Sequence, residues 1–483
     1  MSLPDMLIFM SDQHSPIYSS YMGGVAHTPN LEKICENGTV FTETYTSCPL
    51  CVPARLSMLL GHLPSKSGIF TNDDAIPERN VTFLHSLVAA GYETVLIGRM
   101  HFVGTNQRHG FTKRLVGDIT PVTWSKPIKK ILAERGAFIK GFKDPGCVEE
   151  DIVGGGDSPV LEYDKEVIKT ALEYLKEPHD KPQCIFVSTY GPHFPYCAPP
   201  ELYSYYKEKV SLPESFYNVP EYLNPVLKKK SLDVSEEIAK RAQAAYLAMI
   251  EHIDIQVGLI RNAFNTFLDS NNRKGVFGYI SDHGDHCGDK KMYGKRTFFE
   301  KSAKIPMMFE GVGIIRGERI LTPASIMDLG PTLCELAGTV PPPAQDGVSL
   351  VNELKGINKN SDRAVISEVL DFSKEDTCLG RMVRKGDYKY ITYVGYDDYD
   401  MLFDIKNDPE EKYNVAKNFS HKLNELRKIA LSEWEPYKVL EEHSNHMKSV
   451  ELVKAWELAA GANDDSERWN KNPEYARGNL KIQ

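Results

Sequence analysis

A short stretch around Cys51 has residue types that could support nucleophilic or anion-binding chemistry: Cys48-Pro-Leu-Cys51-Val-Pro-Ala-Arg55-Leu-Ser-Met-Leu-Leu-Gly61. Pro53 suits the first turn of a helix, where its missing N–H is no loss, and Gly61 suits the cap after the last turn. The pattern therefore places Cys51 at a helix N-terminus, where free N–H groups favour an anion. Arg55 adds a planar cation one turn along. We interpret Cys48 as a buried structural cysteine.

Other side chains that could take part in catalysis or ligand binding directly follow short apolar runs. Asp12 follows Met6–Met10, His101 follows Thr94–Gly98, His193 follows Cys184–Thr189, and Asp282 follows Val276–Ser281. A fifth run is Pro306–Phe309, and amphipathic segments separate the runs: Val81–Ala90, Tyr163–Leu175, Glu236–Leu268 and Ile326–Ala337. This alternation predicts an α/β domain whose large, mostly parallel or mixed sheet is sandwiched by helices. Since ligands bind beyond the carboxyl ends of such strands, we expect the four side chains to lie together.

The amino-acid composition changes near residues 338–362, where a Pro-rich turn precedes a polar stretch. We place a domain boundary there, with a catalytic α/β domain over 1–360 and a smaller α+β subdomain over 361–483. The runs Tyr388–Tyr393 and Tyr399–Ile405 predict a small antiparallel sheet, followed by a helix near 421–431 and a tail carrying Trp456 and Trp469. Residues 102–160 predict a long irregular segment, because Gly154-Gly-Gly156 does not suit a regular element.

Composition excludes several classes of protein. The 483 residues hold 57 Lys and Arg against 66 Asp and Glu, a net charge of −9 without basic tracts, which argues against a nucleic-acid partner. No apolar run approaches the roughly 20 residues that a membrane span needs, and the first residues lack the features of a secretory signal. Nine cysteines in a chain of this length do not indicate a disulfide framework, so we expect a cytoplasmic protein.

The string Cys51-Val-Pro-Ala-Arg55, with Gly61 six residues on, resembles the signature of the formylglycine-dependent (type I) sulfatases of the alkaline phosphatase superfamily. The resemblance extends from about Met6 to Asn414 and implies an alkaline-phosphatase-like fold. It also implies that Cys51 is oxidised after translation to 3-oxoalanine (formylglycine) by a maturase, and that the hydrate of this aldehyde is the nucleophile.

The resemblance further implies one divalent metal ion, held by Asp12, Gln13, residue 51, Asp282 and His283. Gln13 stands where the family commonly has a second aspartate. The resulting ligand set carries two formal negative charges and an imidazole, which favours manganese or magnesium over calcium. Asp282 is similar to the family's candidate base for activating the nucleophile.

Further motifs resemble the parts of the family's site that handle the sulfate. Gly98-Arg99-Met-His101 resembles the family's Gly-Lys-x-His, which implies a sulfate-binding cation at Arg99 and a base at His101 for the second hydroxyl of the hydrate. The continuation Asn106–Phe111 is similar to the choline-sulfatase-like branch. The proline-rich turn at His193 implies the residue that binds sulfate and protonates the leaving oxygen, and Lys295 resembles the sulfate-binding lysine of a Lys-x-x-x-x-Glu segment.

Asn72 matches a substrate-binding position in related hydrolases, and Leu402–Asn414 resembles a segment to which we give a structural role. Together the motifs predict a sulfuric ester hydrolase for a small sulfate ester. Choline sulfate, a sulfated sugar and an aryl sulfate all stay open. A quaternary ammonium would need an aromatic cage, for which Trp124, Tyr196 and Tyr293 lie in plausible loops.

Two alternatives remain. A phosphonate monoester or phosphodiester hydrolase of the same superfamily would use the same nucleophile and metal, but the combination of Arg99 with His101 leans toward a sulfatase. A catalytically silent anion-binding homologue would keep Cys51 as a thiol, and complete dependence of hydrolysis on Cys51 would eliminate it. The Trp-bearing tail could pack on a second copy of the chain, so a homo-oligomer is also open.

Overall fold

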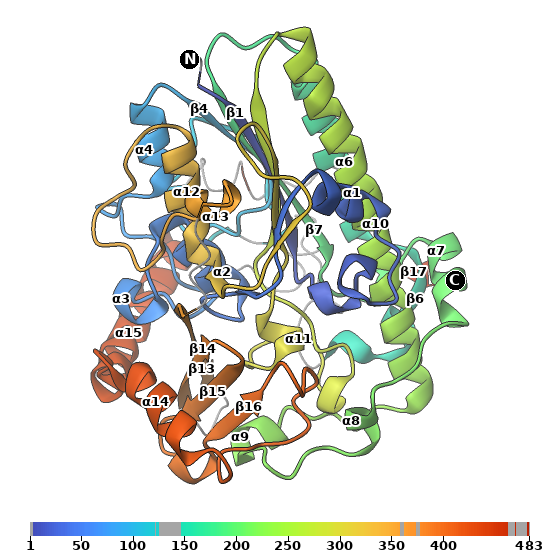
Figure 1. Cartoon of the computed structure of the whole chain (residues 1–483), viewed down its shortest axis with the longest axis vertical. Coiled ribbons are helices and arrows are strands. Elements are labelled where there is room, and N and C mark those ends of the chain that lie inside the picture. The colour runs from blue at the N-terminus through green and yellow to red at the C-terminus, as the bar shows by residue number, and fades with distance from the viewer. Residues whose placement is uncertain are drawn as a thin grey trace.

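A large mixed sheet forms the centre of the protein (Figure 1). The computed structural model describes residues 3–120, 122–124, 146–357, 362–372, 377–461, 469 and 481–482. Eight strands run in the order β11-β2-β10-β9-β1-β7-β4-β5. Their bounds are β1 (Asp5–Asp12), β2 (Gly38–Phe41), β4 (Glu93–Gly98), β5 (Lys113–Val116), β7 (Gln183–Pro192), β9 (Gly275–Ser281), β10 (Met307–Gly311) and β11 (Glu318–Ile320).

The central strands are parallel, as the alternating pattern predicts. β1 pairs in parallel with β7 and β9, and β4 pairs in parallel with β7 and β5. β10 runs antiparallel to both of its neighbours, β9 and β2, so the sheet is mixed. The predicted α/β sandwich is confirmed.

Helices cover both faces because the buried strands are apolar on both sides. In β1, Met6, Ile8 and Met10 join one core, whereas the alternate residues Leu7 and Phe9 join the other. The first core is covered by α2 (Cys51–Leu60), α4 (Phe83–Ala89) and α12 (Leu329–Leu336). The second is covered by α1 (Pro29–Asn37), α6 (Pro159–Tyr174) and α10 (Glu236–Ser270) on the opposite side of the sheet in Figure 1.

The C-terminal region forms a four-stranded antiparallel sheet of β13 (Ala364–Phe372), β14 (Thr377–Lys385), β15 (Tyr388–Tyr393) and β16 (Met401–Asp404). The predicted small antiparallel sheet is therefore confirmed. Two helices follow, α14 (Ser420–Leu431) and α15 (Pro436–Ala460). Trp456, expected in a tail, lies exposed on α15. This sheet shares a core with the loops before α2 and α11, and the division at residue 361 stays a prediction.

One expectation about regular structure is wrong. Gly154-Gly-Gly156 belongs to a strand, β6 (Gly154–Asp157), which pairs with β8 (Cys197–Ala198) and β17 (Lys481–Ile482). Glycine is needed there because a Cβ on Gly156 would lie 1.9 Å from the Lys481 carbonyl oxygen. Within the irregular segment expected over 102–160, residues 121 and 125–145 lie outside the described residues.

Within the described residues, the remaining short elements are β3 (Thr44–Tyr45), α3 (Pro64–Ser67), α7 (Pro200–Lys207), α8 (Glu214–Tyr217), α9 (Pro225–Lys228), α11 (Glu300–Ala303), β12 (Ala324–Ser325) and α13 (Val351–Leu354). Short 3₁₀ segments of the same part of the chain lie at Pro16–Tyr18, Ser20–Met22, Gly146–Val148, Glu150–Ile152, Asp289–Lys291, Ile326–Asp328 and Asp397–Tyr399. Among the described helices, none combines the length and the apolar character that a bilayer crossing requires.

Candidate active site

The carboxyl ends of four parallel strands bring the expected side chains to one edge of the sheet. Asp12 ends β1, Arg99 follows β4, His193 follows β7, and Asp282 follows β9. Because these strands are neighbours in the sheet, residues far apart in sequence meet there.

Helix α2 presents Cys51 to this edge. Cys51 is the first residue of the helix, and Gly61 caps its C-terminus in the left-handed conformation, as the sequence predicts. The N-cap residue, Leu50, offers no side-chain bond, and Asn72 takes over this function by accepting a hydrogen bond from Val52 N at 3.1 Å. In the structure Asn72 thus supports the turn of helix that carries Cys51, and its predicted contact with substrate stays a prediction.

The Cys51 sulfur lies within a buried group of potential metal ligands. Its Sγ is 3.2 Å from His283 Nε2 and 3.8 Å from Asp12 Oδ1. One ligand atom from each of Asp12, Cys51, Asp282 and His283 lies within 4.8 Å of the others. Burial and Asp12 raise the pKa of the Cys51 thiol, but Lys295 and His283 lower it by more, so the pKa lies below its ordinary value.

Cys48 lies in a different environment. It is completely buried, and burial together with Glu368 raises the pKa of its thiol well above the ordinary value. This agrees with the interpretation of Cys48 as an inert structural cysteine.

Arg55 joins the two acidic residues of the group. Its Nε donates to Asp282 Oδ2 at 2.8 Å, and its Nη2 donates to Asp12 Oδ2 at 3.0 Å. All three side chains are fully buried. Burial raises the pKa of Asp12, but Arg99 and Arg55 outweigh it and hold the pKa well below its usual range. Asp12 is therefore an anion in the folded protein.

The donor set fits a divalent cation. His283 Nδ1 lies 3.1 Å from the Gly284 carbonyl and donates to it, so the Nε2 lone pair, which faces Cys51 Sγ, is the potential ligand atom. Asp285 accepts a hydrogen bond from Gln13 Nε2 at 2.5 Å, which turns Gln13 Oε1 the other way, toward Lys295. Carboxylate oxygens with one imidazole are ligands that divalent ions accept. The contribution of Gln13, whose Oε1 accepts from Lys295, stays a prediction.

Lys295 and His193 form a second, cationic part of the site. Lys295 Nζ donates to Gln13 Oε1 at 2.6 Å and lies 2.5 Å from His193 Nε2. His193 Nδ1 donates to the Phe194 carbonyl at 2.7 Å, so Nε2 is the acceptor of the lysine proton. Burial and Lys295 hold the pKa of His193 well below its ordinary value. His193 is accordingly neutral, and the fixed positive charge lies on Lys295.

Arg99 bonds to several other residues of the site. Four of the five N–H donors of its guanidinium bond to protein groups: Nε to Asp12 at 2.8 Å, Nη1 to Asp118 at 2.8 Å and to Thr120 at 2.7 Å, and Nη2 to His101 Nδ1 at 2.6 Å. In this structure the group therefore holds other site residues, and its predicted contact with sulfate stays a prediction.

The sequence analysis did not identify three buried acids of the site. Asp118 bonds to Arg99 and to the His101 backbone, Asp164 accepts from the backbone N–H groups of Tyr190 and Gly191, and Asp285 orients Gln13. Asp285 follows directly on the Asp282-His-Gly string and could have been included. Asp118 and Asp164 lie outside every motif and carry no such signal.

Two of the three aromatic residues considered for a cage, Tyr196 and Tyr293, lie next to each other. Tyr196 is fully buried, and its hydroxyl donates to Asp285. Its ring centre lies 6.4 Å from that of Tyr293, which is also buried. Trp124 instead packs at Gly104, where an added Cβ would lie 3.0 Å from its Nε1.

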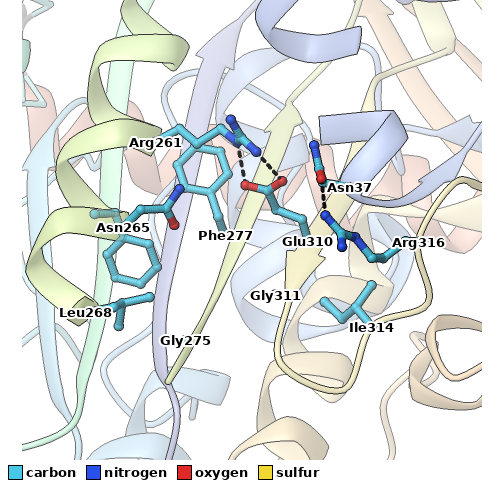
Figure 2. A pocket seen from close by; sticks show the side chains of 11 residues that line it. Asn37, Arg261, Asn265, Leu268, Gly275, Phe277, Glu310, Gly311, Ile314 and Arg316 are labelled. Atoms are coloured by element: carbon cyan, nitrogen blue, oxygen red, sulfur yellow. Dashed lines mark hydrogen bonds and ion pairs between the residues drawn. The ribbon is translucent and has the colours of Figure 1, made fainter. Parts of the chain in front are cut away.

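A surface cavity of about 340 Å³ lies at the other end of the sheet, at Gly275, where β9 begins. Figure 2 shows that its charged groups are paired within the protein: Arg261 with Glu310, and Arg316 with Asn37. Since Asp282 follows the opposite end of β9, this cavity is separate from the candidate site.

Comparison with known proteins places these residues in a family. The family model "Sulfatase" matches residues 4–339, and the model "N-sulphoglucosamine sulphohydrolase, C-terminal" matches residues 288–433. The choline-sulfatase of Rhizobium meliloti (strain 1021) is 34% identical over 442 residues, which cover 86% of this chain and 83% of that protein.

Solved structures share the fold. The structure of BT4656 with its substrate D-glucosamine-2-N,6-O-disulfate has a TM-score of 0.70 at 18% identity and covers 92% of this chain and 99% of that one. The phosphonate monoester hydrolase of Agrobacterium radiobacter has a TM-score of 0.71 at 22% identity and covers 91% of this chain and 96% of that one. The extent of the family match, together with the identity to the choline-sulfatase, shows that the chain belongs to the sulfatase family and is a sulfuric ester hydrolase.

Proposed function

We propose that this sulfatase cleaves a small sulfate ester at the site around residue 51, using a formylglycine derived from Cys51 and one divalent metal ion. The observation that carries the proposal is the convergence of Cys51 with Asp12, Asp282 and His283 beside Arg55. When present, the formylglycine hydrate supplies an attacking oxygen, and the ion supplies a Lewis acid that lowers the pKa of that oxygen and polarises the ester.

The chain's own residues prepare this chemistry. Asp12, Gln13, Asp282 and His283 hold the ion, and Arg55 keeps the two carboxylates in place. The imidazole and the two formal negative charges favour manganese or magnesium over calcium. A formylglycine-generating maturase is the partner that such a site requires.

Lys295 and His193 bind the sulfate and serve the leaving group. The Lys295 ammonium supplies a fixed positive charge at the position where a sulfuryl group carries negative charge, a type of interaction typically worth a few kcal/mol in the transition state. Before His193 can protonate the leaving oxygen, its Nε2 must take up a proton from solvent, because in this structure Nε2 accepts a hydrogen bond from Lys295, which keeps its own charge.

For the substrate, the choline-sulfatase relative favours choline sulfate among the small esters, and a sulfated sugar or an aryl sulfate are the other candidates. The near-complete burial of the site supports a small ester: His101 and Lys295 are each only 7% exposed. None of the nine cysteines, all of which lie in the described part of the chain, forms a disulfide, which supports a reducing compartment such as the cytoplasm. The homo-oligomer expected as one possibility from the sequence stays a prediction.

The second candidate is hydrolysis of a phosphonate monoester, favoured by the shared fold of the phosphonate monoester hydrolase. To separate the two, the chain is co-expressed with a formylglycine-generating enzyme and given choline sulfate, 4-nitrophenyl sulfate and phenyl phosphonate esters. We expect faster cleavage of a sulfate ester. Faster cleavage of the phosphonate would overturn the assignment in favour of the second candidate.

A further inference from the structure

Asp118 is a fully buried carboxylate that lies just beyond β5 and takes part in no sequence motif. Its Oδ1 accepts hydrogen bonds from Arg99 Nη1 at 2.8 Å and from the backbone and hydroxyl of Thr120 at 3.0 and 2.9 Å. Its Oδ2 accepts from the His101 backbone N–H at 2.9 Å. One acid thus joins Arg99 and His101, the two site residues that follow β4.

The backbone of His101 explains why such a support is needed. His101 has φ of 60°, in the left-handed region that residues other than glycine rarely adopt. A residue other than glycine keeps this strained backbone conformation only where several contacts with its surroundings hold it there. The bond from the His101 N–H to Asp118 is one such constraint, and it fixes the direction in which the imidazole leaves the backbone.

Arg99 adds a constraint on the ring itself. Its Nη2 lies 2.6 Å from His101 Nδ1. A guanidinium has only donors and stays protonated in proteins, so Nδ1 must be the acceptor. A neutral imidazole that accepts at Nδ1 carries its proton on Nε2. Asp118 in turn holds the far side of the same guanidinium through Nη1.

We propose that Asp118 is a positioning residue that, through Arg99, fixes His101 in the tautomer with its proton on Nε2. The proposal rests on the proposed function and deepens it. It makes His101 a hydrogen-bond donor to the sulfate or to residue 51, whereas the resemblance implies a base. A base acting through Nε2 would need its proton on Nδ1, where Arg99 donates.

The first experiment measures the tautomer directly and needs no catalytic activity. Uniformly ¹⁵N-histidine-labelled full-length protein with unconverted Cys51 is studied by NMR, and the His101→Gln variant assigns the His101 signals. We expect wild-type His101 to show the pattern of a neutral ring protonated at Nε2, and Asp118→Asn to show a mixture of the two tautomers. Arg99→Met removes the donor to Nδ1 and should produce the same mixture, which keeps the test available if Asp118→Asn does not fold.

The second experiment measures the kinetic consequence in the converted enzyme. Asp118→Asn should lower kcat on the order of tenfold to a hundredfold with little change in KM, since a misaimed group costs about that much. Asp328→Asn is the matched control, because Asp328 is also fully buried and bonds to an arginine, Arg363, and to the backbone N–H groups of Ser325 and Val348 outside the site. The control should keep the kcat of the wild type.

Two results would overturn the proposal: a wild-type His101 protonated at Nδ1, or an Asp118→Asn variant with unchanged His101 signals or unchanged kcat. If the enzyme cleaved no sulfate ester at all, the proposed function would fail while the NMR result still reported on the tautomer. The two failures are therefore distinguishable.

Discussion

Arg55 holds two buried acids, Asp12 and Asp282, side by side. Replacing it measures how much this pairing contributes to the free energy of unfolding. Its guanidinium donates to Asp282 and Asp12 through Nε and Nη2, and to the Arg99 carbonyl and Ser188 Oγ through Nη1, at 3.1 and 3.2 Å. Arg55→Met leaves Asp282 without its buried cation, and removing one partner of a buried pair costs about 3–5 kcal/mol.

Arg55→Lys provides the graded comparison. A lysine keeps a positive charge between the carboxylates but loses the bonds to the Arg99 carbonyl and to Ser188. Two lost hydrogen bonds at about 1 kcal/mol each give a cost of about 2 kcal/mol. The free energy of unfolding should therefore fall in the order wild type, Arg55→Lys, Arg55→Met.

The assay is urea unfolding of the full chain in EDTA, repeated with Mn²⁺. Since the ion supplies positive charge beside the same carboxylates, Mn²⁺ should narrow the gap between Arg55→Met and the wild type. The reasoning is refuted if Arg55→Met is as stable as the wild type in EDTA, or if the lysine variant loses as much as the methionine variant.

Three further predictions concern the support of the site. Asn72→Ala removes the cap on Val52 N and should cost about 1 kcal/mol in urea unfolding, and no loss would contradict its capping role. Burial raises the pKa of Asp164 to about 7 from 3.8, so the folded protein keeps a proton that the unfolded chain releases, and the free energy of unfolding should fall as pH rises from about 4 to 7. The slope is at most about 1.4 kcal/mol per pH unit; Asp164→Asn should remove this contribution, and equal pH profiles of the two proteins would disprove it. Finally, EDTA should abolish sulfate release, and Mn²⁺ or Mg²⁺ should restore it better than Ca²⁺; full activity in EDTA would exclude the metal.

The edge of the sheet where the site forms could be predicted because it follows from periodicity alone. Apolar runs long enough for strands, separated by helical segments, imply parallel pairing, and parallel strands bring their following residues to one edge. Asp12 and Asp282, 270 positions apart in the sequence, are thereby placed at the carboxyl ends of the adjacent strands β1 and β9. The helix that begins at Cys51 could be predicted equally well, because Pro53 and Gly61 mark its two ends.

What the sequence could not reveal depends on contacts between distant segments. The bonds of Arg99 to Asp118 and Asp12 could not be predicted, because nothing local marks a carboxylate 19 positions away as a partner of Arg99. The strand at Gly154–Asp157 was missed because its glycines are required by the close approach of Lys481, from the far end of the chain. Such pairings follow from the tertiary fold and not from propensity.

The central claim is that sulfate-ester hydrolysis depends on Cys51, and one measurement tests it most directly. The wild type, Cys51→Ala and Cys48→Ala are each co-expressed with a formylglycine-generating enzyme and assayed with 4-nitrophenyl sulfate and choline sulfate. Cys48 is the matched control, a buried thiol three positions away with a raised pKa. We predict that Cys51→Ala loses all hydrolysis while Cys48→Ala retains it. Turnover by Cys51→Ala, or equal loss in both variants, would contradict the account.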